Sequence, residues 1–392
     1  MYRRVDKVTL KIYNTDIMIP RFIEKQVLSS LKPGKVCAVF GPRRSGKTVF
    51  LEMIRDKLAA KKVLSVQGEN LDVAEILSSM RHSTLAKFTK GYDYLFVDEA
   101  QKIPQIGQSL KLLVDTEKSL TVLVTGSSSF SLRQKVGDPL VGRISQYYLY
   151  PFAQMELKEN FLEVKENLET RLVFGSYPEV FQAKTLSEKR RQLEAIRDGY
   201  LLRDILELDN IKDSLFVFNI LRLIAFQIGN DISYSELAQN LNSNKKTVMR
   251  YLELLEKSYV LFSHPGFSRN LRSEYTKTPR YYFWDNGVRN AVISNYNRLE
   301  SRDDVGRLWE NYCICERRKK SAYKNIFANR YFWRTYNQKE IDYVEERGAK
   351  LFGYEFKWSQ KEKVKTPKLW MQAYKNARFS LITPKNYLEF IT

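Results

Sequence analysis

The stretch from Gly41 to Thr48 has the residue types and the spacing of a loop that binds phosphate groups. Its sequence, GPRRSGKT, fits the pattern G-x-x-x-x-G-K-[ST] between an apolar run over 36–40 and a helical pattern over 49–58. Glycines let the backbone N–H groups turn inward toward phosphate oxygens, and the helix N-terminus adds positive charge. Lys47 would reach the β- and γ-phosphates, and the Thr48 hydroxyl would bind Mg²⁺. A chance glycine-rich turn is the alternative, which the strand–loop–helix context disfavours.

ATP and Mg²⁺ are the cofactors that this loop predicts, with ATP and ADP as small-molecule partners. The residues predicted to bind the nucleotide are Gly41, Pro42, Arg43, Arg44, Ser45, Gly46, Lys47, Thr48 and Val49.

A second apolar run, residues 94–97, ends in two carboxylates, Asp98 and Glu99. Asp98 is predicted to hold Mg²⁺ through its water shell, and Glu99 to polarise an attacking water as general base. An acid directly after the metal-binding aspartate favours a hydrolase over a nucleotide kinase. Solvated acids at the end of a buried strand are the alternative.

A third expected strand, residues 120–124, ends in a cluster of small polar residues over 125–129. Such a cluster can sense the γ-phosphate and position the water. Ser127 is the first choice for this role and Thr125 the second, while a turn made of small residues is the alternative.

The segments GPRRSGKT, LFVDEAQKIP, VTGSSSF and VGRISQYYLYPF, followed by GSYPEVF, YLLRDI and YYFWDNGVR, resemble AAA+-related P-loop ATPases with a C-terminal DUF4143 region. This resemblance spans nearly the whole chain. It implies an α/β fold with a RecA-like parallel sheet, a helical lid, a winged helix and an α/β restriction-endonuclease-like C-terminal domain. It also implies that Arg143 contacts the nucleotide or a structural acid, and that Arg203 acts on phosphate, directly or from a neighbouring subunit. The pattern identifies no arginine finger, so a homo-oligomer stays an open alternative to a monomer.

Four domains are expected from the element pattern and the resemblance. Their boundaries are 1–151 for the ATPase core, 152–230 for the lid, 231–290 for the winged helix and 291–392 for the C-terminal domain.

Residues 232–262 have the pattern of a helix-turn-helix. Ser233 or Ser235 can cap a first helix, and the second carries one apolar stripe with Lys245, Lys246 and Arg250 off that stripe. The N-terminal turns of a recognition helix are where DNA contacts occur. The basic residues predicted to form a wing are Arg269, Arg272, Lys277 and Arg280. A winged helix used only for protein packing is the alternative.

The last region carries a second set of charged residues. Period two over 351–358 puts Glu355 and Lys357 on one face of a strand, and a hairpin brings Asp342 near them. Two carboxylates can hold Mg²⁺ while a lysine positions a water at phosphorus. These residues resemble the D…E-x-K core of the restriction-endonuclease-like fold, and Glu310 matches the acid that this fold supplies from its first helix. Charged residues on a solvent-facing hairpin are the alternative.

Composition and net charge limit the kinds of partner that the protein is expected to bind. The net charge is +20, and residues 241–392 hold 30 Lys and Arg against 16 Asp and Glu. This basic, aromatic-rich half suits DNA, with an anionic lipid or protein as the alternative. No apolar run approaches the roughly 18 residues of a membrane span, and the N-terminus lacks the pattern of a secretory signal. The three cysteines form no disulfide framework, so a cytoplasmic location is expected.

Two functions follow from these features. The first is a Mg²⁺-dependent ATPase that couples ATP binding and hydrolysis to DNA binding, with DNA cleavage as an added activity. The second is an ATP-gated regulatory or signalling protein whose C-terminal domain is a catalytically silent docking module.

Overall fold

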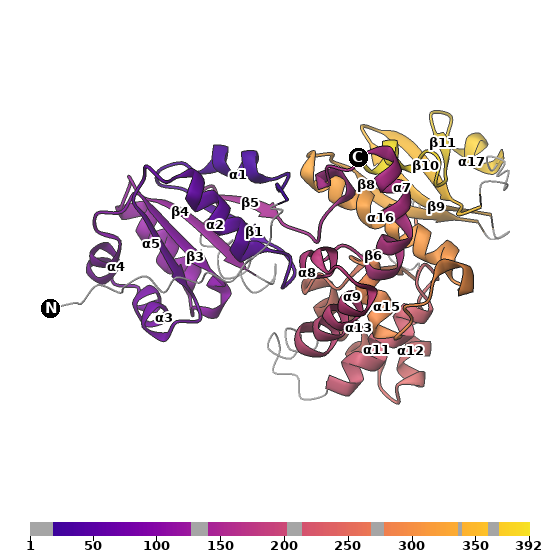
Figure 1. Ribbon diagram of the computed structural model, residues 1–392, viewed down its shortest axis with the longest axis horizontal. Helices are drawn as coiled ribbons and strands as arrows, with labels where there is room; N and C mark the ends of the chain where they lie inside the picture. Colours follow the sequence, from indigo (N-terminus) through magenta and orange to yellow (C-terminus); the bar gives the residue numbers. More distant parts are fainter. Residues whose placement is uncertain (1–18, 127–139, 202–213, 268–277, 336–338, 360–367) are drawn as a thin grey trace.

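The computed structural model describes residues 19–126, 140–201, 214–267, 278–335, 339–359 and 368–392. Figure 1 shows two lobes, an N-terminal one in indigo and purple and a second that holds the helical region and the C-terminal domain. The chain passes between them after strand β5, Ile144–Tyr148.

A five-stranded sheet in the order β2-β3-β4-β1-β5 forms the centre of the N-terminal lobe, and all of its neighbouring strands are parallel. Every residue of β1 and β4 is buried, which is typical of a parallel sheet covered on both faces. The other strands and the helices of this lobe are β1 Val36–Phe40, β2 Val63–Gln67, β3 Tyr94–Asp98, β4 Thr121–Gly126, α1 Glu24–Ser30, α2 Lys47–Lys57, α3 Leu71–Ser78, α4 His82–Thr89, the short η1 Ala100–Lys102 and α5 Ile106–Thr116. The predicted α/β class with a RecA-like parallel sheet is confirmed.

A helical region follows the short turn η3, Gln154–Glu156. It consists of α7 Phe161–Phe174, α8 Pro178–Gln182, α9 Leu186–Ile196, the π-helical turn η4 Arg197–Leu201 and α11 Ser214–Phe226. Helix α15, Asn286–Val292, comes much later in the chain but packs against α7, α9 and α11. The helical region therefore contains a helix that lies outside the predicted lid, 152–230, and that the predicted boundary at 290 divides; the four domain boundaries stay predictions.

Two helices and a two-stranded antiparallel sheet lie between α11 and α15. They are α12 Tyr234–Asn240, α13 Lys245–Lys257, β6 Leu261–His264 and β7 Arg280–Phe283. The Ser233 hydroxyl caps α12 by accepting the Glu236 N–H, and the Asn244 side chain caps α13 by accepting the Thr247 N–H. Both helices and the Ser233 cap agree with the sequence prediction.

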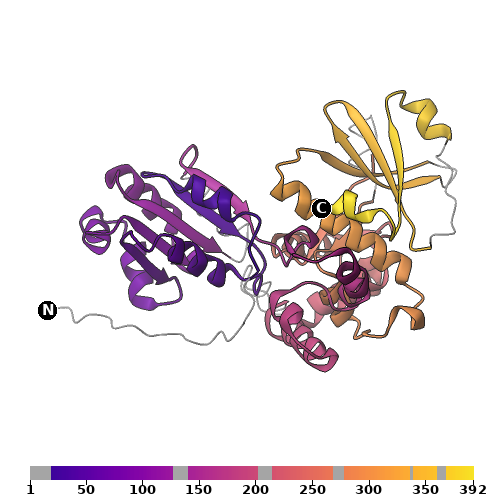
Figure 2. The same cartoon turned by 45° about the horizontal axis from the view of Figure 1, so that its top comes forward.

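The C-terminal domain is an α/β unit with a mixed four-stranded sheet in the order β11-β10-β9-β8. Strand β9 is antiparallel to β8 and β10, while β11 is parallel to β10. Figure 2 shows this sheet rising from the helical layer that contains α16. Its elements are the short η5 Leu299–Ser301, α16 Val305–Tyr323, β8 Asn329–Arg334, β9 Glu340–Arg347, β10 Lys350–Phe356, α17 Lys368–Ala373, β11 Arg378–Ile382 and α18 Tyr387–Ile391.

The predicted hairpin in this domain is confirmed. Strands β9 and β10 pair from Arg347↔Lys350 to Tyr343↔Tyr354, and the turn residues Gly348 and Ala349 both have positive φ. This pairing fixes which charged side chains meet at the far end of the hairpin.

Candidate functional site

The phosphate-binding loop joins β1 to α2, as its pattern predicted, and both of its glycines have a structural reason. A Cβ at Gly41 would lie 2.1 Å from the Leu149 carbonyl oxygen, so no other residue fits there. Gly46 has φ +90°, which is strained for L-residues with a side chain. The loop is therefore shaped by close backbone approach at one glycine and by left-handed backbone at the other.

Helix α2 begins at Lys47, directly behind the loop. The first N–H groups of a helix have no partner within it, so they are available to an anion bound at the loop. The buried Lys47 ammonium donates to the Gly41 and Pro42 carbonyls at 3.1 and 2.9 Å. Its charge is held at the loop, where a triphosphate would need it.

The end of β3 meets the start of α2 through side chains. The Thr48 hydroxyl donates to Asp98 Oδ2 at 2.6 Å, and the Thr125 hydroxyl at the end of β4 donates to Asp98 Oδ1. Strands β3 and β4 are parallel neighbours, so their carboxyl ends lie at one edge of the sheet. The structure thus brings together Thr48, Asp98 and Thr125, the second choice for the sensing residue.

Glu99 follows in the left-handed region, with φ +51°. Its backbone N–H donates to Asp98 Oδ1 at 3.1 Å and to Thr125 Oγ1 at 3.2 Å, which fixes the turn. Its carboxylate accepts a hydrogen bond from the Gln101 amide. The side chain that the sequence assigns as general base is therefore oriented by a neighbour two residues on, which the sequence reasoning missed although Gln101 lies in the LFVDEAQKIP segment.

Two further contacts of the loop come from outside the predicted site. Arg21, just before α1, donates to the Ser45 carbonyl at 2.9 Å and is buried in an ion pair with Glu156 at 3.1 Å. Arg44 pairs with Glu179 of α8 at 2.8 Å. A lone arginine before a helix gives no sequence signal for the first contact, whereas Glu179 lies in the GSYPEVF segment.

Three further residues are predicted to act near the nucleotide: Ser127, Arg203 and Arg143. Ser127 and Arg203 lie outside the described residues. Arg143 forms an ion pair with Asp115 at 2.7 Å, which is the structural-acid alternative of the two that the resemblance implied.

The charged residues of the C-terminal domain gather where β9, β10 and α16 meet. Asp342 Oδ2 accepts the Phe356 N–H at 2.9 Å, and the Lys357 ammonium lies 3.1 Å from Glu355 Oε1. Glu310 of α16 accepts from the Tyr282 hydroxyl at 2.6 Å. Asp342 and Glu355 are buried, so the solvent-facing alternative for these acids is wrong.

A β-bulge helps to aim Asp342. Strand β8 has one residue between Tyr331 and Trp333, whereas the partner strand has two between Val344 and Ile341. The extra residue in β9 breaks the strict alternation of faces at this point. Sequence periodicity cannot show such a bulge, because it depends on the register with β8.

Burial is the main influence on these acids. It raises the pKa of Glu310 to about 7. Burial, then the charges of Glu310 and Glu355, raise the pKa of Asp342 well above its usual range. Burial also raises the pKa of Glu355, although Lys357 opposes the shift. Neighbouring carboxylates add to the shift of each, with Glu340 acting on Glu310 and Glu355.

Asp342 and Glu355 have the chemistry to bind a divalent cation. Glu355 Oε2 is buried without a hydrogen-bond partner, and a cation would offset the repulsion between Glu355 and Asp342. Within the described ranges, however, no three His, Cys, Asp or Glu side chains are grouped as metal ligands. The arrangement suits Asp342 and Glu355 as metal ligands, whereas the Glu310 carboxylate is held by the Tyr282 hydroxyl.

The surface of α13 keeps its predicted cations accessible, since Lys245, Lys246 and Arg250 are all exposed. The predicted wing is corrected at Arg280, which is buried and paired with Asp231 at 3.0 Å and Glu340 at 2.8 Å. Two carboxylates at one guanidinium leave it no free charge for DNA. The other three wing residues, Arg269, Arg272 and Lys277, lie outside the described part of the chain.

Two general features complete the description. Cys37, Cys313 and Cys315 are free and buried. Among the described helices, none combines the length and the apolar character that crossing a membrane requires.

Comparisons with known families divide the chain into three consecutive matches. Residues 33–158 match an AAA domain, residues 165–299 a domain of unknown function, DUF8612, and residues 305–388 a domain of unknown function, DUF4143. The DUF8612 match covers the helical region together with α12 to α15, in agreement with the packing of α15 on α7.

Relatives match this chain over most of their length. An uncharacterised protein of Methanocaldococcus jannaschii is 24% identical over 399 residues, which cover 95% of this chain and 85% of the relative. An uncharacterised protein of Mycobacterium tuberculosis is 25% identical over 336 residues, covering 84% and 71%. Among solved structures, a Walker-type ATPase of Pyrococcus abyssi is similar with a TM-score of 0.48 and 17% identity, covering 70% of this chain and 96% of that one.

The order of these matches agrees with the resemblance drawn from the sequence motifs. The chain carries a match to an AAA domain in its N-terminal lobe and a match to DUF4143 in its C-terminal domain.

Proposed function

We propose that this protein is a Mg²⁺-dependent ATPase that couples ATP binding and hydrolysis to DNA binding. The observation that carries the proposal is the contact between Thr48 and Asp98, 2.6 Å apart, at the mouth of a loop that ends in Lys47. These are the positions from which a P-loop enzyme binds its metal and its phosphates.

Each residue has a defined task in this proposal. Lys47 and the loop N–H groups bind the phosphates, and Thr48 with Asp98 would hold Mg²⁺, which neutralises charge on the β- and γ-phosphates. Glu99 accepts a proton from the attacking water while Gln101 and the Thr125 contact hold its orientation. Ser127 stays a predicted sensor of the γ-phosphate.

The test is ATP hydrolysis by the full chain with Mg²⁺ and after chelation. We expect slow hydrolysis that stops without the metal, and loss of nucleotide binding in Lys47→Ala, because a point charge on the phosphates is removed. Lys57→Ala, at the far end of α2, is the matched control. Hydrolysis that persists in Lys47→Ala would contradict the assignment.

DNA binding through α12, α13, β6 and β7, which we assign to the predicted winged helix, is the second part of the proposal. Support comes from the exposed cations at the N-terminal turns of α13 and from the basic C-terminal half. Neutralising Lys245, Lys246 and Arg250 together should weaken duplex binding and reduce its salt dependence, with little change in thermal stability. Unchanged affinity would favour a protein-docking role for this helix.

For the C-terminal domain we propose phosphodiester cleavage with Asp342 and Glu355 as metal ligands and Lys357 as the group that positions water. A bound Mg²⁺ would polarise the phosphate and activate its water. Lys357 is held toward Glu355, and Glu310 lies close to the pair on α16, where the Tyr282 hydroxyl donates to it.

A specific observation favours the second function, an ATP-gated regulatory protein with a silent docking domain. Asp342 and Glu310 already accept hydrogen bonds from Phe356 and Tyr282. The deciding assay incubates supercoiled and linear DNA with Mn²⁺, with and without ATP, comparing the wild type with Asp342→Ala and Lys357→Ala. Nicking that both substitutions remove supports the nuclease, and absence of nicking in every condition supports the docking module.

The cytoplasmic location and the assembly state belong to the same proposal. Three free cysteines suit a reducing compartment. A homo-oligomer would allow a neighbouring subunit to supply an arginine to the nucleotide.

A further inference from the structure

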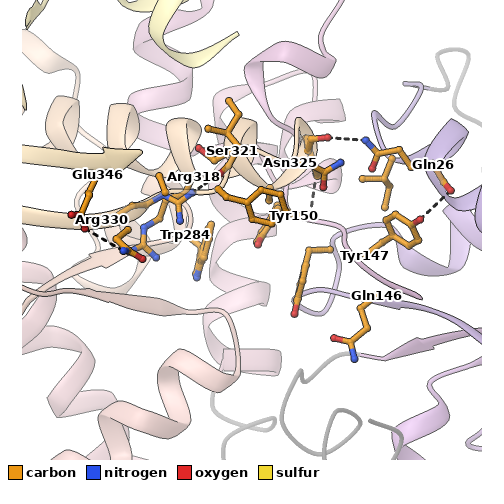
Figure 3. A pocket seen from close by; sticks show the side chains of 18 residues that line it. Gln26, Gln146, Tyr147, Tyr150, Trp284, Arg318, Ser321, Asn325, Arg330 and Glu346 are labelled. Atoms are coloured by element: carbon orange, nitrogen blue, oxygen red, sulfur yellow. Dashed lines mark hydrogen bonds between the residues drawn. The ribbon is translucent and has the colours of Figure 1, made fainter. Parts of the chain in front are cut away.

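A cavity of about 650 Å³ lies between the two lobes, away from the residues assigned to ATP and to the C-terminal acids. In Figure 3, one wall comes from the N-terminal lobe, with Gln26, Gln146 and Tyr147, and Tyr150 lies in the segment that joins the lobes. The other wall comes from α16, the loop after it and β8. Its volume is within the range of about 300–1,000 Å³ that is typical of small-ligand sites.

Two arginines on one wall are the first property of this cavity, and the charge of Glu256 offsets part of the charge of Arg318. Helix α16 carries four consecutive cations, Arg317–Lys320, and their partners differ. Arg317 binds Glu345 through two bonds of 2.8 Å, and Lys319 pairs with Glu316 at 2.8 Å. Arg318 instead donates to the Ser263 carbonyl at 3.1 Å and lies 4.1 Å from the Phe262 ring centroid.

Arg330 of β8 brings a second guanidinium to the same wall, where Figure 3 shows it near Arg318. Over the described ranges, neither arginine forms an ion pair, and the Nε of each is buried without a hydrogen-bond partner. Burial and the neighbouring Arg330 charge lower the pKa of Arg318. An anion between the two guanidiniums would relieve this repulsion.

Flat aromatic and amide surfaces are the second property. Tyr147 and Tyr148 of β5 are half-buried at the cavity, and Tyr150 stacks on Trp284 with centroids 4.5 Å apart. Rings of this kind stack on nucleobases, and side-chain amides such as that of Gln146 can bond base edges. Among the described lining residues, Glu346 is the one carboxylate, and it already accepts from Asn329 at 3.2 Å.

We propose that this cavity binds a nucleotide unit, an aromatic base with its phosphate, from single-stranded nucleic acid or from a free nucleotide. Arg318 and Arg330 bind the phosphate, and one tyrosine of β5 stacks on the base. The site adds to the proposed function and is separate from the α13 surface and from the phosphate-binding loop.

The site also has a route to the ATPase core. The Gln26 amide, which lines the cavity, donates to the Tyr323 carbonyl at 2.8 Å, and the Tyr323 hydroxyl lies 3.4 Å from Arg21. Arg21 in turn bonds the loop carbonyl of Ser45. Occupancy of the cavity is therefore connected by direct contacts to the backbone that surrounds the nucleotide phosphates.

The test measures fluorescence anisotropy of a labelled oligothymidylate of about ten nucleotides on the full chain at low salt. Arg330→Gln removes one guanidinium, and Ala322→Glu places a carboxylate at an exposed position of the cavity rim. We expect both variants to bind about tenfold more weakly than the wild type. Arg298→Gln, an exposed arginine of the same lobe outside the cavity, is the matched control and should bind like the wild type.

Competition by thymidine monophosphate separates the two sources. Displacement at millimolar concentration identifies a single nucleotide as sufficient, whereas resistance identifies the strand. No binding by the wild type, wild-type affinity in both cavity variants, or an equal loss in Arg298→Gln overturns the proposal. ATP hydrolysis is measured on the same variants, and its retention shows that a loss of oligonucleotide binding does not reflect failure of the ATPase assignment or of folding.

Discussion

Asp98 and Glu99 of the N-terminal lobe receive hydrogen bonds from hydroxyl, amide and backbone donors. Burial raises the pKa of Asp342, Glu355 and Glu310 of the C-terminal domain, and neighbouring carboxylates add to each shift. Both regions use carboxylates near the end of a strand with a lysine nearby. Asp342 and Glu310 also accept a backbone and a hydroxyl hydrogen bond, so the carboxylates buried beside one another are what distinguish the C-terminal region.

This difference separates two ways of keeping a carboxylate ready for a metal. Around Asp98, two threonine hydroxyls hold the negative charge in place, so its geometry is set before a ligand arrives. Around Asp342, charge is disfavoured until a proton or a cation compensates it. The N-terminal site is therefore expected to bind Mg²⁺ with its nucleotide, and the C-terminal site to depend on pH and on free metal.

The largest expected effect concerns the preorganised site. Glu99→Gln should reduce ATP turnover by about 10²–10⁴-fold while ATP remains bound, because an amide cannot accept the proton of the attacking water. Single-turnover hydrolysis and nucleotide binding measure the two quantities separately. Glu69→Gln, an exposed acid just after the neighbouring strand β2, serves as the control. Turnover at the wild-type rate in Glu99→Gln would show that Glu99 is not the general base.

The second effect concerns Glu310, whose pKa rises from 4.5 to about 7 on folding because of burial. The folded chain binds this proton more tightly than the unfolded chain between those pH values, so stability is lost as the pH rises through this window. Glu310→Gln should therefore raise the free energy of unfolding at pH 8 by about 2 kcal/mol, with little change at pH 4.5.

Chemical unfolding with a chelator present, at both pH values, measures this difference. The exposed Glu300→Gln is the matched variant and should show no such pH dependence. Adding Mn²⁺ at pH 8 should stabilise the wild type but not Asp342→Ala. A wild type that gains stability between pH 5 and 8 through Glu310 would reverse the sign and contradict the burial argument.

Sequence reasoning predicted the two regions to different depths for a physical reason. The loop follows β1 directly in the sequence, and the two acids stand at the end of β3. A parallel sheet places the ends of these strands at one edge. Thr48, Asp98 and Thr125 could therefore be placed together without knowing the rest of the fold. Arg21 could not be placed in this way, because the ion pair that holds it against the loop joins it to Glu156, which lies 135 residues later in the chain.

The C-terminal site shows the opposite limit. The hairpin follows from alternation and from the turn at Gly348, so the proximity of Asp342 and Glu355 was predictable. Their burial was not, since it depends on the bulge in β9 and on α16 packing over the sheet. Arg280 was misplaced for the same reason, because its acidic partners are 49 and 60 residues away in the sequence.

The smallest expected effect concerns the Arg143–Asp115 ion pair in the N-terminal lobe. Arg143 pairs with Asp115 at 2.7 Å, and both side chains are roughly one-third exposed. An exposed pair of this kind contributes about 0.2–1 kcal/mol, so Arg143→Gln should lower the melting temperature slightly. ATP turnover and nucleotide affinity should stay at wild-type values, because the guanidinium is held by a structural acid rather than by phosphate. Asp115→Asn should reproduce the same small loss of stability, and the double variant should lose no more than either single one. A drop in ATP affinity in Arg143→Gln, without one in Asp115→Asn, would instead place the arginine on the nucleotide and add a donor to the preorganised site.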